Sequence, residues 1–156
     1  MLRENLQGSG GTPGTNIFLV PRCWECDVFE DQTPAGIALK EKANRGFRGY
    51  PTATVTFYGP DDRRASKVAV AIVPREGAEA AALERWFSEY EDIRSDVAVA
   101  HEILAFLRRY GAKSVAMADR IIGCPHEEGI DYPEGEVCPQ CRFWAQRDRW
   151  TGGILQ

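Results

Sequence analysis

The chain has 156 residues, of which 44% are hydrophobic and 27% charged. These proportions are typical of a globular domain with a core and exclude a wholly disordered chain. The net charge of −4 argues against a surface that binds nucleic acid phosphates over most of its area. No apolar run reaches the roughly 18 residues of a membrane-spanning helix, so we expect no membrane contact.

The N-terminal stretch is polar and rich in glycine. Residues 1–15 contain no apolar segment of signal-peptide length, so we expect a flexible leader on a cytoplasmic protein. The remaining residues, 16–156, are predicted to form one domain. Five cysteines is an odd number, and their close pairing suits thiolates in a reducing compartment better than a disulfide framework.

The first predicted elements are a strand and a helix. The apolar run at residues 17–21 predicts a short strand. Thr33 and Pro34 have the chemistry of a helix N-cap and first turn, and Gly46 suits the residue after a helix end. We therefore expect a helix over residues 34–43.

Residues 52–58 and 67–73 are rich in Val, Thr and aromatic residues, and a segment rich in Gly, Pro and Asp separates them. This combination predicts two antiparallel strands joined as a hairpin.

Two stretches after the hairpin show helical spacing of apolar residues. They are Leu83, Trp86, Phe87 and Tyr90 in the first, and Val97, Ala100, Leu104 and Leu107 in the second. Ser95 is the expected N-cap of the second helix and Gly111 its C′ residue. Residues 114–118 then predict a strand that leads to Cys124 and His126. The expected fold is α/β or α+β, a small mixed sheet with two to three packed helices and a zinc-knuckle loop within about residues 119–150.

Four residues near the C-terminus have the spacing of a zinc site. Zn²⁺ takes about four sulfur or nitrogen ligands in a tetrahedron, and the Cys-x-His pair and the Cys-Pro-x-Cys pair supply three thiolates and one imidazole. These predicted ligands are Cys124, His126, Cys138 and Cys141. Residues two apart on an extended segment point to the same side, and Pro139 shapes the turn in the second pair, as in the knuckles of zinc ribbons. The intervening loop, rich in Gly and Pro, brings the pairs together.

The pair Cys23 and Cys26 leaves three uses open: a redox dithiol, half of a metal site, or core residues. In one alternative, these two cysteines join Cys138 and Cys141 in an all-thiolate site, since two CxxC knuckles are typical of zinc ribbons. We prefer the local set of ligands because it closes a shorter loop.

A strand leading into CxxC, followed by Gly49-Tyr-Pro-Thr and a second strand, resembles the thioredoxin superfamily over about residues 17 to 90. The resemblance implies a thiol-disulfide oxidoreductase that uses Cys23 and Cys26, with Pro51 at the position of the proline, usually cis, beside the dithiol. Trp24 and Glu25 depart from the small or proline residues of that motif, and the Glu25 charge is expected to raise the thiol pKa values.

A second alternative is a zinc-dependent hydrolase or nucleobase deaminase. His126-Glu-Glu followed by Cys138-Pro-Gln-Cys resembles the deaminase zinc motifs, with Glu128 as general base. However, a fourth protein ligand at Cys124 fills the position that a catalytic water needs.

Two clusters mix cations with aromatic rings and are candidate binding surfaces. They are Arg45, Phe47, Arg48 and Tyr50 in the first, and Arg142, Trp144, Arg147, Arg149 and Trp150 in the second. Structural packing is the competing interpretation. The five acids without Lys or Arg between Cys124 and Cys141 favour packing, because they repel phosphates. The sequence as a whole favours a zinc-stabilised binding or adaptor module, whose partner is a protein or a nucleic acid.

Overall fold

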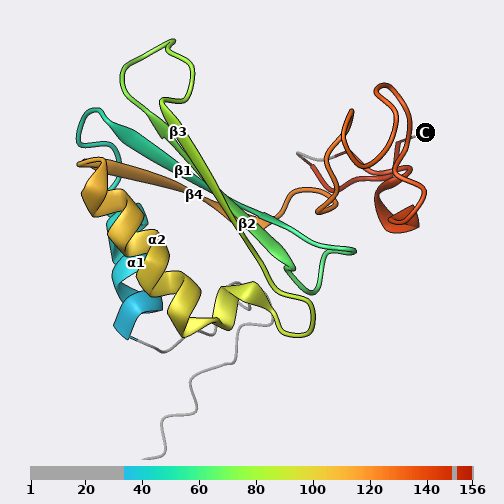
Figure 1. Cartoon of the computed structure of the whole chain (residues 1–156), viewed down its shortest axis with the longest axis horizontal. Coiled ribbons are helices and arrows are strands. Elements are labelled where there is room, and N and C mark those ends of the chain that lie inside the picture. Colours follow the sequence, from blue (N-terminus) through green and yellow to red (C-terminus); the bar gives the residue numbers. More distant parts are fainter. Residues whose placement is uncertain (1–33, 149–150, 156) are drawn as a thin grey trace, which may run out of the picture.

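A computed structural model describes residues 34–148 and 151–155 as a four-stranded mixed sheet with both α-helices on one face (Figure 1). The expected fold class is confirmed, including a loop after the sheet that gathers cysteine and histidine side chains. The expected leader, the strand over residues 17–21 and the Cys23–Cys26 pair lie outside the described residues.

The sheet has the strand order β3-β2-β1-β4. The strands are β1 (Thr52–Tyr58), β2 (Lys67–Val73), β3 (Ala82–Phe87) and β4 (Ser114–Ile121). β1 and β2 form the predicted antiparallel hairpin, with Thr52 opposite Val73. β1 also pairs in parallel with β4, which the chain reaches after passing through β2, β3 and α2 (Val97–Arg109).

The core lies between the sheet and the helices. Alternation along β1 turns Ala53, Val55 and Phe57 inward, where each is at most 2% exposed. The intervening threonines and Tyr58 lie half-buried on the other face, which no helix of the described residues covers (Figure 1). The sheet is thus packed on one side and open on the other.

The helices agree with their predicted positions apart from one cap. α1 (Pro34–Asn44) ends just before Gly46, whose φ of +69° suits glycine. α2 begins after Asp96, not Ser95: the Asp96 carboxylate accepts hydrogen bonds from the amides of residues 98 and 99. Ser95 instead closes the preceding short 3₁₀ helix. Within the described ranges, no helix has the length and hydropathy needed to cross a bilayer.

The stretch from residue 83 to 90 is a strand and a turn, so the amphipathic helix predicted there is wrong. β3 pairs antiparallel with β2 over its whole length. Trp86 faces the helices and packs edge-on against Phe106, with ring centroids 6.1 Å apart. Leu83 and Phe87 lie on the open face, 48% and 64% exposed. The helical prediction failed because residues four apart share a face both in a helix and in a strand. A strand at this position also pairs with the backbone N–H and C=O groups of β2, which would stay unpaired if residues 82–87 were helical.

Candidate metal centre

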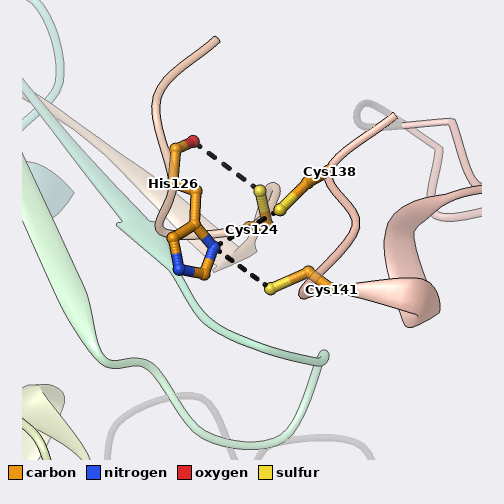
Figure 2. A group of neighbouring side chains, drawn as sticks. All are labelled: Cys124, His126, Cys138 and Cys141. Carbon is orange, nitrogen blue, oxygen red and sulfur yellow. Dashed lines mark hydrogen bonds between the residues drawn. The ribbon is translucent and has the colours of Figure 1, made fainter. Parts of the chain in front are cut away.

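The four predicted ligands lie together. One ligand atom from each of Cys124, His126, Cys138 and Cys141 can be chosen so that all four atoms lie within 4.8 Å of one another (Figure 2). His126 Nδ1 is 3.5 Å from Cys138 Sγ and 3.4 Å from Cys141 Sγ. A tetrahedral zinc ion with Zn–S near 2.3 Å separates its ligand atoms by about 3.5–3.8 Å. The side chains are therefore close to the spacing that such an ion requires.

The end of β4 positions the first two ligands. The Ile122 amide donates to Phe57 O, and the Gly59 amide donates to Gly123 O, both at 2.9 Å. Gly59 is required at this contact because a Cβ would lie 2.0 Å from the carbonyl oxygen of Arg64. The hairpin turn after β1 thus anchors the backbone immediately before Cys124.

The second pair of ligands leads into a 3₁₀ helix, η2 (Arg142–Trp144). The Trp144 amide donates to Cys141 O at 3.1 Å, while its indole Nε1 donates to Gly59 O at 2.8 Å. The Trp144 ring packs against the core of the sheet and against the cysteine cluster. The Trp144 side chain therefore joins the sheet to the loop that carries the four candidate ligands.

The loop between the two pairs is held by its own hydrogen bonds. The backbone carbonyl of Glu127 accepts hydrogen bonds from the amides of Ile130 and Asp131, and the Glu127 amide donates to an Asp131 carboxylate oxygen. The Gly135 amide donates to Glu128 Oε1 at 2.6 Å. We call residues 123–148 the metal lobe.

The three cysteines of the metal lobe are buried, and with Tyr132 they form its apolar centre. Burial, together with the neighbouring Cys124 and Cys138, raises the pKa of Cys141 to about 12. The Cys141 thiol therefore holds its proton at neutral pH without a cation, and a divalent metal bound there would displace that proton.

A cluster of three charges attaches the metal lobe to the open face of the sheet. Lys67, with 5% of its side chain exposed, donates to Glu127 Oε1 at 2.7 Å and to the carbonyl of Pro125 at 3.0 Å. Arg85 Nε lies 2.7 Å from the same carboxylate oxygen. The hydrogen bond from Lys67, followed by the charges of Lys67 and Arg85, holds the pKa of Glu127 below its usual value despite partial burial.

The two cation and aromatic clusters lie at opposite ends of the sheet. Arg45, Phe47 and Arg48 are exposed and Tyr50 is half-buried, next to the starts of β1 and β4. The metal lobe follows the end of β4. The Arg48 amide donates to Ser114 Oγ at 2.7 Å, and the Phe47 and Tyr50 rings are 5.3 Å apart. The two clusters do not form one continuous surface.

In the second cluster, most contacts are internal. Arg147 lies 4.2 Å from the centre of the Phe143 ring and donates to the carbonyl of Gly152, and Trp144 is packed as described above. Arg142 is exposed. Arg149 and Trp150 lie outside the described residues. These contacts support the packing interpretation for Trp144 and Arg147.

The described residues include only some of those on which the two alternative functions depend. Cys23 and Cys26 lie outside the described residues, so the dithiol and the all-thiolate site stay predictions. The Tyr50–Pro51 bond is cis, as the thioredoxin resemblance implies. Within the described residues, β1 is paired on both edges, with β2 and with β4. Glu128, the proposed general base, is exposed at the edge of the metal lobe.

Sequence reasoning did not identify Gly59, Lys67, Glu127 and Tyr132 as parts of the site. Lys67 is an ordinary first residue of a strand in the sequence, and only its burial against the metal lobe distinguishes it. A glycine directly after a strand was the one available signal, because it marks a close backbone approach.

Comparison with models of protein families, with curated proteins and with solved structures found no match for this chain.

Proposed function

We propose that the chain is a zinc-stabilised binding module, in which one Zn²⁺ orders the metal lobe for contact with another macromolecule. The observation that carries this proposal is the placement of four ligand atoms within 4.8 Å of one another. Three sulfurs and one imidazole are a donor set that favours zinc over hard cations such as Mg²⁺ or Ca²⁺.

The size of the apolar centre supports a structural role for the metal. Apart from the cysteines, the buried cluster of the metal lobe contains only Tyr132, with Trp144 packed against it. Burying a large side chain contributes about 1.5–3 kcal/mol, whereas ordering the backbone costs about 1–2 kcal/mol per residue. Roughly two dozen ordered residues therefore need a further source of stability, and structural zinc contributes about 10–16 kcal/mol.

The number of ligands favours binding over catalysis. Four protein ligands complete a tetrahedron, whereas a catalytic zinc keeps one position for water or substrate. If Cys124 occupies the fourth position, the metal binds no water from which Glu128 could accept a proton. The proposed role of the metal is thus to fix the shape of the metal lobe.

Elemental analysis of the purified chain tests the proposal. We expect one zinc per chain, and we expect Cys138→Ser and Cys124→Ser to lose it. Cys23→Ser is the matched control, because it removes a thiol outside the set of four. Retention of zinc by Cys124→Ser with loss in Cys23→Ser would instead establish the all-thiolate alternative. Absence of bound zinc from freshly purified protein would refute the proposal.

A further inference from the structure

A groove of about 420 Å³ lies between the open face of the sheet and the metal lobe. Its floor consists of small side chains, Thr54 and Thr56 from β1 and Ala69 and Ala71 from β2, with the larger Tyr58 and Lys67 at one end. Leu83 lines the groove on β3, and the metal lobe lines it on the opposite side. Small residues leave room above the sheet for side chains of another molecule.

On the β3 side, Leu83 and Arg85 line this groove, and Phe87 lies on the same face of the strand. Leu83 and Phe87 point to the open face, and 48% and 64% of their surfaces are accessible. In the part of the chain that the structure describes, both α-helices lie on the opposite face of the sheet (Figure 1). Exposed apolar side chains beside a concave surface are typical of a binding site.

Polar groups in the groove have unused hydrogen-bonding capacity. A metal on His126 Nδ1 leaves the ring proton on Nε2, which points away from the sulfurs in Figure 2. Within residues 34–148 and 151–155, Nε2 has no hydrogen-bond partner, and neither does the Thr54 hydroxyl. A metal-bound histidine usually donates this proton to a carbonyl or a carboxylate, and a peptide backbone offers carbonyls.

The charge of the metal lobe selects the partner. Lys67 and Arg85 pair with Glu127 and exceed it by one positive charge, which the carboxylate of Glu128, exposed at the groove, offsets. Three more acids and no Lys or Arg follow before Cys141. Three thiolates around Zn²⁺ add a further negative charge. This side of the groove therefore attracts cations and repels phosphates.

We infer that the groove binds an extended basic segment of another protein. An apolar side chain of that segment lies on the small-residue floor against Leu83, and a neighbouring Lys or Arg pairs with Glu128. The inference rests on the proposed function, because the metal holds one wall of the groove in place. It also names the partner class, a peptide rather than a nucleic acid.

Fluorescence polarisation with a short labelled peptide of alternating Lys and Leu tests the inference. The protein is used with its zinc content measured beforehand. We expect saturable binding that weakens with added salt, and at least about tenfold weaker binding of a peptide of alternating Glu and Leu. Equal binding of the two peptides, or tighter binding of a single-stranded oligonucleotide, would overturn the inference.

Two variants locate the site. Leu83→Asn removes the apolar contact on β3 without adding a charge, and Glu128→Lys reverses the charge at the rim, so each is expected to weaken binding about tenfold or more. Glu134→Lys is the matched control, because it makes the same charge change in the metal lobe at an exposed residue outside the groove lining. Equal loss in Glu134→Lys and Glu128→Lys would mean a diffuse charge effect and would also overturn the inference.

The outcomes separate the two proposals. If protein that carries one zinc does not bind the basic peptide, the inference about the groove is overturned and the proposed function stands. Protein without zinc refutes the proposed function. Leu83→Asn lies on β3, away from the candidate ligands, so it tests the groove even if Glu128→Lys alters the metal lobe.

Discussion

The sheet with its helices and the metal lobe are stabilised in different ways. The first part encloses 18 mutually packed buried residues, whereas the buried cluster of the second has four, three of which are cysteines. The first part can therefore fold through hydrophobic burial, and under the proposed function a metal supplies the stability of the second. The two parts meet at Gly59, Lys67 and Trp144, where backbone, charge and ring contacts cross between them.

Removal of the metal is expected to have the largest effect and to divide the two parts. A strong chelator should abolish amide protection throughout the metal lobe, while amides of β1 and β2 keep most of theirs, since their core contains no ligand. Hydrogen exchange with and without chelator measures this. Loss of protection in both parts together would show that the sheet depends on the metal lobe, contrary to the comparison.

A core truncation should affect the other part. Leu107, on α2, is 2% exposed, and Leu107→Ala is expected to lower the free energy of unfolding by about 2–5 kcal/mol because it leaves a cavity. Zinc stoichiometry should not change. Ile130→Ala, at a residue of the metal lobe that is 77% exposed, is the control and should change the free energy by less than about 0.5 kcal/mol. Chemical denaturation and elemental analysis check both.

The contact between the parts should show an intermediate effect. Lys67→Met removes the buried partner of Glu127, and we expect a loss of about 1–3 kcal/mol. Arg85→Met should cost less than about 1 kcal/mol, because the Arg85 side chain is 38% exposed. A double-mutant cycle of Lys67→Met with Glu127→Gln measures the coupling; additivity would mean that the ion pair does not attach the metal lobe.

The smallest expected effect is a pH dependence that belongs to the sheet and helices alone. Burial disfavours the charged form of Asp92, but hydrogen bonds and charge from Arg94, with the Ala65 amide, outweigh it and lower the pKa from 3.8. The stabilisation is complete above pH 3.8 and is lost as pH falls through the lower folded pKa. Asp92→Asn lacks this stabilisation, so the gap between its free energy of unfolding and that of the unmodified chain should narrow as the pH falls over that range, by at most about 1 kcal/mol. Denaturation curves from pH 6 down to pH 3 measure the gap, and a constant gap would contradict the assignment.

Local patterns were sufficient for several elements. The hairpin strands were predicted with their observed bounds, because alternation and turn residues act over a few neighbours. The end of α2 at Gly111, with φ of +61°, was also readable, since few other residues adopt that conformation. The ligand spacing of the metal centre belongs to the same class, because both pairs lie within one short segment.

Other features depend on contacts between distant residues. Ser95 and Asp96 are both good caps, and only the hydrogen bonds of the preceding turn decide between them. For Trp144 the sequence left a binding surface and packing open, and its hydrogen bond to Gly59, across 85 residues of sequence, supports packing. A single sequence pattern carries no information on such pairings.

The sequence by itself determined the mixed fold class, the hairpin and the set of four candidate metal ligands, since each follows from spacing within a short stretch. Only the tertiary structure decided that residues 82–87 extend the sheet, that Lys67 is buried beneath the metal lobe, and that small side chains form a groove beside it. The physical reason is that helical and extended spacing coincide over four residues, so a local pattern cannot choose between a helix and a strand. The choice, like the burial of Lys67, depends on strand edges and charged groups that lie far away in the sequence.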